Sequence, residues 1–188
     1  SKVRASLPKD FYAVQNDAIK FGNIIICGTR GWNLPQNDQF QTPEDEKIFK
    51  REVLRLDMTL ANAVKSKESN DKIICMIHYP PVDQNKNDSE FSLLLEKYSV
   101  DYVVFGHIHG KNNFDKHFIK NGIEYFLTSA DQLKNQLALI MNIDENSTDD
   151  RFGWISGRAG SINEPAYSNN TVTGCTATKG GNVVEVEE

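Results

Sequence analysis

Several things are scarce in this 188-residue sequence. It has no run of roughly 18 apolar residues, the length that a transmembrane helix needs, and its first residues, Ser1–Pro8, lack the apolar stretch of a signal peptide. Its three cysteines (Cys27, Cys75 and Cys175) never show a CxxC spacing, and two of them lie inside apolar runs. These absences argue against a disulfide-stapled secreted scaffold and a membrane protein, and they predict a cytoplasmic location.

An excess of positive charge is also missing. The 21 Lys and Arg are outnumbered by 26 Asp and Glu, for a net charge of -5. Residues 1–141 contain 18 basic and 18 acidic side chains, whereas residues 142–188 contain 3 basic and 8 acidic ones. Because a nucleic-acid groove needs a basic excess, the neutral body argues against such a partner. We expect residues 1–143 to form the folded body and residues 144–188, rich in Asn, Thr, Ser and Gly, to be a flexible or foreign tail.

Buried-type strands alternating with helical stretches predict an α/β protein. The predicted strands are Phe11–Val14, Asn23–Gly28, Lys72–Ile77, Val100–Phe105, Phe118–Lys120, Ile123–Thr128 and Leu137–Ile143, and the predicted helices span residues 43–66 and 89–98. Thr42 and Pro43 form a typical helix start, and Asn121-Gly122 is a strong hairpin signal. Beyond residue 144, only Asn182–Val186 resembles a strand.

Three of the four histidines lie just past the ends of the two most hydrophobic predicted strands. His78 comes after Lys72–Ile77, and His107 and His109 come after Val100–Phe105. In open α/β sheets, ligands bind outside the carboxyl ends of the strands, and alternate residues of an extended segment point the same way. We therefore expect His107 and His109 to face one locus, where neutral imidazoles bind divalent metal ions.

Simpler interpretations stand beside these. A single histidine at a strand end is more often a hydrogen-bonded structural residue than a ligand, which applies to His78 taken alone and to His117 in its polar turn. Arg30 could bind a phosphate as a fork donor or be a solvated loop residue. Tyr79 could line the mouth of a site or pack on the adjacent prolines.

The strand–His78-Tyr79-Pro80-Pro81 and strand–Gly106-His107-Ile108-His109 segments together resemble the C-terminal half of calcineurin-like metallophosphoesterases. The stretch Phe11–Trp32 is similar to a bacterial subfamily of predicted phosphohydrolases. The resemblance covers roughly residues 1–143. It implies a layered β-sandwich flanked by helices, here truncated at the N-terminus.

The resemblance also implies a chemistry. In the family, two divalent ions (Mn, Fe or Zn) activate a bridging hydroxide that attacks a phosphate mono- or diester. By the family pattern, His78 and His107 would bind one ion and His109 the other, while Arg30 and Tyr79 are candidates for contacts with the phosphoester substrate.

The family pattern further includes an Asp-x-His, a Gly-Asp-x-x-Asp and a Gly-Asn-His-Asp/Glu, none of which precedes His78 in this sequence. The carboxylate ligands and the general-acid histidine of the family are thus not identified here, and we expect a partial domain. Three histidines without the bridging carboxylate would hold at most one ion.

Three functions remain open at this point. The first is a metal-dependent phosphoesterase, and the second is a catalytically incompetent fragment or scaffold that holds one metal ion or none. The third is a mononuclear zinc site built from the three histidines. A partial sheet would also expose a strand edge, so self-association is expected.

Overall fold

The computed structural model describes residues 5–7, 11–37 and 42–141, together with the backbone of three strands between residues 154 and 185. In chain order the elements are β1 (Phe11–Ala13), β2 (Asp17–Phe21), β3 (Ile24–Thr29), α2 (Pro43–Lys65), β4 (Lys72–Ile77), α3 (Glu90–Lys97), β5 (Tyr102–Phe105), β6 (His117–Lys120), β7 (Ile123–Leu127), β8 (Ala138–Met141), β9 (Trp154–Arg158), β10 (Gly174–Thr178) and β11 (Val183–Glu185).

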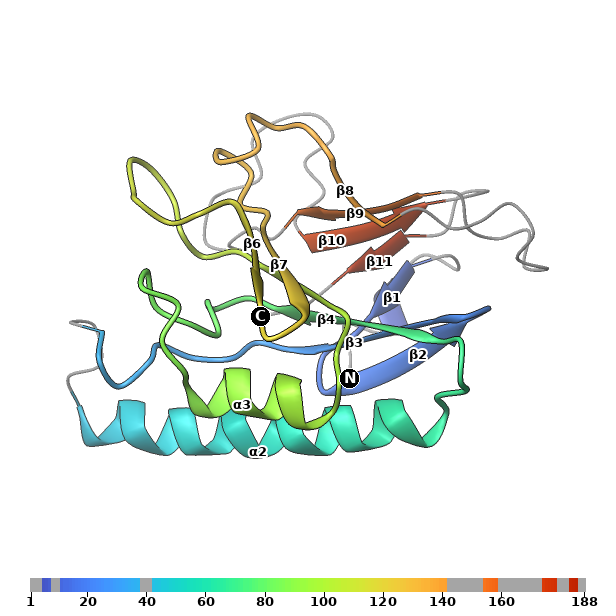
Figure 1. The fold of residues 1–188 in the computed structure, drawn as a ribbon, viewed down its shortest axis with the longest axis horizontal. Helices are drawn as coiled ribbons and strands as arrows, with labels where there is room; N and C mark the ends of the chain where they lie inside the picture. Colours follow the sequence, from blue (N-terminus) through green and yellow to red (C-terminus); the bar gives the residue numbers. More distant parts are fainter. Residues whose placement is uncertain are drawn as a thin grey trace.

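A six-stranded mixed sheet in the order β2-β3-β4-β5-β7-β6 organises the molecule (Figure 1). The four inner strands are parallel, and the two edge strands, β2 and β6, run antiparallel to their neighbours. All six residues of β3 and five of the six in β4 are buried. Continuous apolar runs are typical of parallel strands covered on both faces. The predicted α/β class is confirmed.

Helices α2 and α3 cover one face of this sheet (Figure 1). The Thr42 hydroxyl accepts a hydrogen bond from the Asp45 backbone N–H at 3.1 Å, and the Asp45 carboxylate accepts one from the Thr42 N–H at 3.0 Å. This capping box and Pro43 at the first turn start α2 where the sequence predicts. Ser89 caps α3 in the same way.

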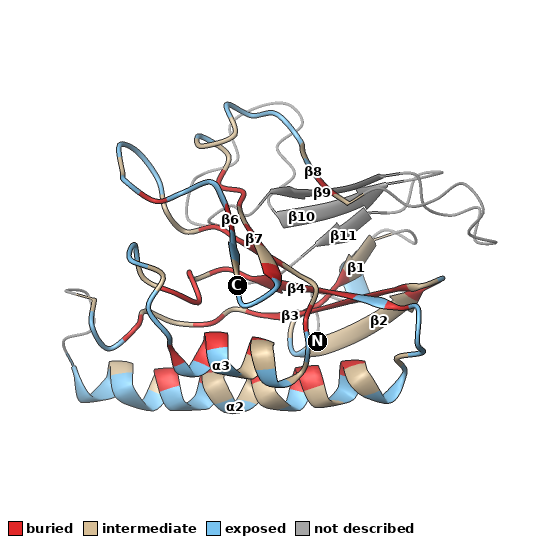
Figure 2. Ribbon diagram, viewed as in Figure 1, coloured by how far each residue is buried: buried red, intermediate tan, exposed pale blue. Residues whose placement is uncertain are grey.

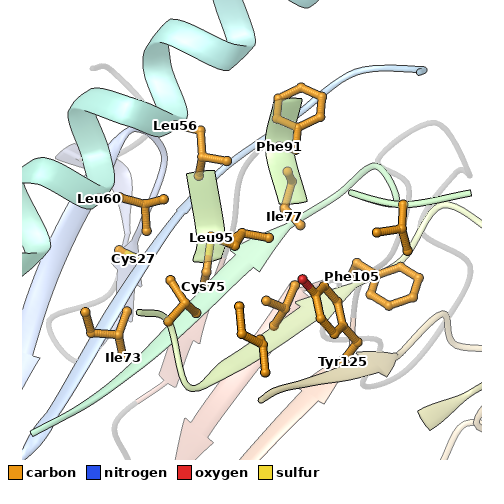
Figure 3. Packing of buried hydrophobic residues seen from close by; sticks show 14 of the residues in the cluster. Cys27, Leu56, Leu60, Ile73, Cys75, Ile77, Phe91, Leu95, Phe105 and Tyr125 are labelled. Atoms are coloured by element: carbon orange, nitrogen blue, oxygen red, sulfur yellow. The ribbon is translucent and has the colours of Figure 1, made fainter. Parts of the chain in front are cut away.

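The helix-covered side of the sheet is mainly apolar. Leu56 and Leu60 of α2 pack with Phe91 and Leu95 of α3 against inward-facing sheet residues (Figure 3). Those sheet residues include Ile25, Cys27, Ile73, Cys75, Ile77, Val103, Phe105 and Tyr125. Both helices have a buried side that faces the sheet and an exposed side that faces away from it (Figure 2), as their apolar stripes predict. Cys27 and Cys75 are buried and free, as expected for small hydrophobes.

The other face of the sheet carries a second apolar cluster. Ile24, Ile26, Ile74, Met76 and Val104 pack there with Ile140 of β8. Strands β8, β9 and β10 form a three-stranded antiparallel sheet on the side away from the helices (Figure 1). The central sheet is therefore apolar on both faces, and polar chemistry is left to its edges and strand ends.

Two expectations about secondary structure differ from the structure. Residues 17–21, which lie between the predicted strands Phe11–Val14 and Asn23–Gly28 and belong to neither, are strand β2, which pairs with β3 in a hairpin. At the edge of a sheet, polar side chains can reach water, so a strand there can contain residues such as Asp17 and Lys20. These polar residues interrupt the apolar pattern by which a strand is recognised. Strands β9 and β10 also lie in the segment after residue 144 that was expected to lack periodic structure, whereas β11 falls within the predicted Asn182–Val186. The remaining residues of the predicted tail lie outside the described residues.

Other expectations are confirmed. Asn121 and Gly122 both adopt positive φ values (50° and 83°) between β6 and β7, as a two-residue hairpin turn requires. Gly28 lies so close to β4 that a Cβ there would stand 2.2 Å from the carbonyl oxygen of Met76. In the described part of the chain, neither helix combines the length and apolarity needed to cross a bilayer.

Candidate functional site

The residues singled out from the sequence meet at the carboxyl edge of the sheet. Arg30 follows β3, His78 follows β4 and Gly106-His107 follows β5, and these three strands are parallel. The Arg30 carbonyl accepts hydrogen bonds from the backbone N–H groups of His78 and Tyr79, each at 3.1 Å. The His78 carbonyl in turn accepts one from the Gly106 N–H at 3.1 Å. The sheet ladder therefore continues past the strand ends and fixes the loops side by side.

His78 and His107 form a close pair of imidazoles. The Nε2 atom of His78 lies 3.3 Å from the Nδ1 atom of His107, and the rings cross at 76°. His107 reaches this position with a φ of 67°, in the left-handed region, directly after Gly106. Such a conformation is uncommon for a residue with a side chain, and in structures it gathers at functional sites.

Both rings of the pair are neutral at neutral pH. His78 is only 6% exposed, and burial lowers its pKa to about 4, with smaller contributions from the positive charge that His107, His109 and Arg30 can carry. Burial also lowers the pKa of His107, helped by His109. Neutral imidazole is the form that binds metal ions. Each neutral ring keeps one N–H and one unprotonated nitrogen, and which ring donates in the 3.3 Å contact between them depends on the tautomer.

An aromatic layer supports this pair. The ring of Tyr79 lies against that of His107, tilted by 33° with the centroids 4.2 Å apart, and it also lies 5.1 Å from the His78 ring and 5.2 Å from the Trp32 ring. The Trp32 indole N–H donates to the Asp45 carboxylate at 3.2 Å. Tyr79 therefore lies against the His107 ring, and Trp32 connects Tyr79 to α2.

A buried carboxylate, that of Glu52, pairs with Arg30. Its guanidinium lies 4.6 Å above the Trp32 ring and 3.4 Å from Glu52 of α2, which is completely buried. Glu52 also accepts hydrogen bonds from the Thr29 hydroxyl at 3.2 Å and from Arg55 at 2.7 Å. Arg30 is thus a held cation near the histidine pair, which departs from the simpler expectation of a solvated loop arginine.

His109 takes a different partner. Its Nδ1 atom lies 2.8 Å from a carboxylate oxygen of Asp131, in the loop after β7, and its side chain is half exposed. The alternation of an extended segment predicts that His107 and His109 face one locus, but the positive φ at His107 breaks that alternation. The two rings therefore make separate contacts.

His117 pairs with Glu124 across the β6–β7 hairpin at 3.0 Å and stacks on Phe126, so it has the structural role expected from the sequence. The segment Asp115–His117 shows an Asp-x-His spacing, yet it lies on this hairpin, and Asp115 pairs with Lys86.

The metal ions implied by the family resemblance can be tested against these donors. A tetrahedral zinc ion with Zn–N bonds of about 2.0–2.1 Å separates two ligand nitrogens by about 3.3–3.4 Å. The His78–His107 distance of 3.3 Å equals that separation. However, no group of three or more His, Cys, Asp or Glu side chains within the described residues could hold a metal ion. The described donors therefore fit two ligands of one ion and do not fit a complete two-ion centre.

Sequence reasoning missed Glu52 and Asp131. Glu52 sits on the buried side of α2 amid an apolar stripe, and a charge there is the only sequence signal of a special role. Asp131 follows β7 by a few residues at the same edge of the sheet as the histidines. The rule that sites gather at the carboxyl ends of parallel strands could have found it, had β7 been recognised as parallel to β5.

Comparisons with known proteins bear on this arrangement. No curated protein matches the chain. A solved structure described as "GAP50 the anchor in the inner membrane complex of Plasmodium" shares 13% identity with a TM-score of 0.37, over 86% of this chain and 51% of that one. This chain thus spans about half the length of that structure, and the likeness carries no argument.

The family comparison is decisive. A family model described as calcineurin-like phosphoesterase matches residues 7–111, more than half of the 188 residues. The match includes Arg30, His78, Tyr79, His107 and His109 and ends shortly after the last of them. This protein belongs to the calcineurin-like phosphoesterase family.

Proposed function

We propose that this protein takes part in the hydrolysis of a phosphate mono- or diester, with the carboxyl edge of its central sheet as the reaction site. Family membership supports phosphoester hydrolysis in general. The observation that carries the proposal for this chain is the His78–His107 pair, two neutral imidazoles whose nitrogens lie 3.3 Å apart at that edge.

In this proposal the chain supplies His78 and His107 as two ligands of one divalent ion (Mn, Fe or Zn) and His109 as a ligand of a second. When bound, such ions supply a hydroxide at neutral pH and neutralise the charge on the phosphoryl oxygens. Because the described residues do not complete a two-ion centre, hydrolysis requires further ligands beyond those described here.

The roles of the other residues follow from charge and position. Arg30 is a permanent cation near the histidine pair, and a guanidinium suits phosphoryl oxygens because its donors form a planar fork. Glu52 and Trp32 restrict where this cation can lie. Tyr79 would contact the substrate beside the histidine pair, because its ring lies against that of His107 and is only partly buried. We therefore propose Arg30 and Tyr79 as the substrate contacts.

A second function is favoured by one observation. Because no described group of three donors could hold a metal ion, the chain by itself could be a catalytically incompetent scaffold that holds one ion or none. The two proposals differ in a direct way. An enzyme turns over phosphoesters in a metal-dependent manner, and a scaffold does not.

Hydrolysis of bis(p-nitrophenyl) phosphate and p-nitrophenyl phosphate by the full chain, with Mn²⁺ or Zn²⁺ added, separates them. Catalysis predicts metal-dependent turnover that falls by more than about 100-fold in His78→Ala and His107→Ala, beyond the usual loss for an outer-shell partner. His117→Ala is the matched control and should retain full activity. No turnover with any added metal would support the scaffold, and turnover unaffected by both substitutions would overturn the assignment of the site.

A further inference from the structure

Asp131 clamps the end of the Gly106–Gly110 segment. One of its carboxylate oxygens lies 2.8 Å from Nδ1 of His109, and the other accepts the backbone N–H of Gly110 at 2.6 Å. Gln132 completes the contact, since its side-chain NH₂ donates to the Gly110 carbonyl at 2.7 Å and to Asp131 at 3.1 Å. The loops that follow β5 and β7 are thereby joined through side chains of both.

This contact determines where the ring proton of His109 lies. An aspartate is ionised at neutral pH and can only accept hydrogen bonds. The backbone N–H of Gly110 and the side-chain NH₂ of Gln132 both donate to this carboxylate, which therefore accepts at each of these contacts. The proton shared between Asp131 and His109 must therefore come from the ring, on Nδ1. In the neutral ring, Nε2 is then left with its lone pair.

A second histidine–carboxylate pair uses the other nitrogen of the imidazole ring. His117 contacts Glu124 through Nε2, at 3.0 Å, and not through Nδ1. The same reasoning gives His117 the opposite tautomer, with its proton on Nε2. The pair on the hairpin engages the far nitrogen of the ring, whereas the pair at the carboxyl edge engages the near one and leaves the far nitrogen available.

We propose that Asp131 is a positioning residue: it holds His109 as the Nδ1–H tautomer, so that Nε2 is presented at the carboxyl edge of the sheet as a nitrogen ligand for a divalent cation. Histidines that bind metals commonly donate their other ring N–H to a carboxylate, which fixes the tautomer and orients the ring. The tautomer follows from the contacts of Asp131 alone, while the use of Nε2 as a ligand rests on the proposed function.

Long-range ¹H–¹⁵N correlation spectra of the full chain, labelled with ¹⁵N-histidine and recorded without metal at pH 8, report both tautomers. We expect His109 to be protonated on Nδ1 and His117 on Nε2. Asp131→Ala should change the His109 tautomer ratio by at least about tenfold toward Nε2–H, because it removes a hydrogen bond to a charged acceptor. The matched control, Glu124→Ala, should alter His117 and leave His109 unchanged.

The outcomes separate the inference from the proposed function. A wild-type His109 that carries its proton on Nε2 would overturn the inference, even if Asp131→Ala fails to fold. So would a folded Asp131→Ala protein with an unchanged ratio. Addition of Zn²⁺ should then shift the Nε2 resonance of His109 while Nδ1 stays protonated. If the tautomer is as expected and Zn²⁺ shifts no histidine, the proposed function fails and the positioning role of Asp131 stands.

Discussion

The helix-covered face of the sheet and its carboxyl edge are both buried, yet they bury opposite kinds of side chains. Between α2 and the sheet, Leu56 and Leu60 belong to a large cluster of buried apolar residues. At the edge, His78 and Glu52 are as buried as core residues, but they are polar or charged. Burying apolar area stabilises a fold, whereas burying an ionisable group costs free energy unless it is paired. The face thus maintains the fold, and the polar groups buried at the edge support the proposal that the reaction site lies there.

The largest effect is expected on the apolar face. Leu56→Ala should lower the free energy of unfolding by about 2–5 kcal/mol, because it removes buried methyl groups and leaves a cavity between α2 and β3. Urea denaturation followed by circular dichroism measures this. Met58→Ala, on the exposed side of the same helix, is the control and should change stability by less than about 0.5 kcal/mol. Equal losses in the two variants would contradict the described packing of α2.

The next effect tests the buried charge at the edge. Glu52→Gln keeps the shape of the side chain but removes the negative charge shared by Arg30, Arg51 and Arg55. We expect a loss of about 1–3 kcal/mol, below the figure for a fully buried pair because the three arginines are partly exposed and can be solvated. Urea denaturation of Glu52→Gln reports the loss.

Glu46→Gln is the matched control for that substitution, since Glu46 pairs with Lys50 on the exposed side of the same helix. It should cost less than about 0.5 kcal/mol. If Glu52→Gln lowers the free energy of unfolding no more than this control does, the buried carboxylate does not anchor the arginines, and Arg30 is not held beside the histidine pair.

A pH dependence tests the histidine pair. The pKa of His78 in the folded protein is about 4, below the ordinary value of 6.5 that the unfolded chain has. The unfolded state therefore binds more protons between these values, and stability falls as the pH drops from about 6.5 toward 4. The slope from His78 is at most about 1.4 kcal/mol per pH unit, and none is expected from it above pH 7.

Unfolding of the metal-free protein at pH 7 and pH 5 measures this slope. His78→Gln should show a weaker loss between the two pH values than the wild type, since glutamine does not titrate. An identical loss in both proteins would show that His78 is not held neutral by burial.

The smallest effect is expected at the hairpin. Glu124→Ala removes the exposed partner of His117 and should change stability by less than about 0.5 kcal/mol. The same urea experiment measures it. A loss above 1.5 kcal/mol would erase the distinction between the histidines of the carboxyl edge and that of the hairpin.

The sequence predicts the fold better than the site, for a physical reason. Apolar runs such as Ile24–Cys27 and the capping signals at Thr42 act locally, so strands and helices can be inferred from them. The edge strand β2 was missed because Asp17 and Lys20 interrupt its apolar pattern. His78 and His107 could be placed together because each follows a buried strand directly.

The contacts that complete the site depend on tertiary structure. Asp131 meets His109 across 22 positions of sequence, and Glu52 reaches Arg30 from a helix. A positive φ at His107, uncommon for a residue with a side chain, interrupts the alternation expected of an extended segment, and His109 contacts Asp131 instead. Local periodicity indicates which face of a helix or strand is apolar. It does not indicate which polar groups of different elements come into contact, so none of these features follows from it.

Calorimetric titration of Zn²⁺ into the full chain tests the central claim most directly, that the His78–His107 pair at the carboxyl edge binds a divalent cation. The account predicts that the wild type and His117→Ala bind Zn²⁺ alike, while His78→Ala and His107→Ala each lose affinity by more than about 100-fold. Wild-type protein that binds no Zn²⁺, or equal binding by all four proteins, would contradict it.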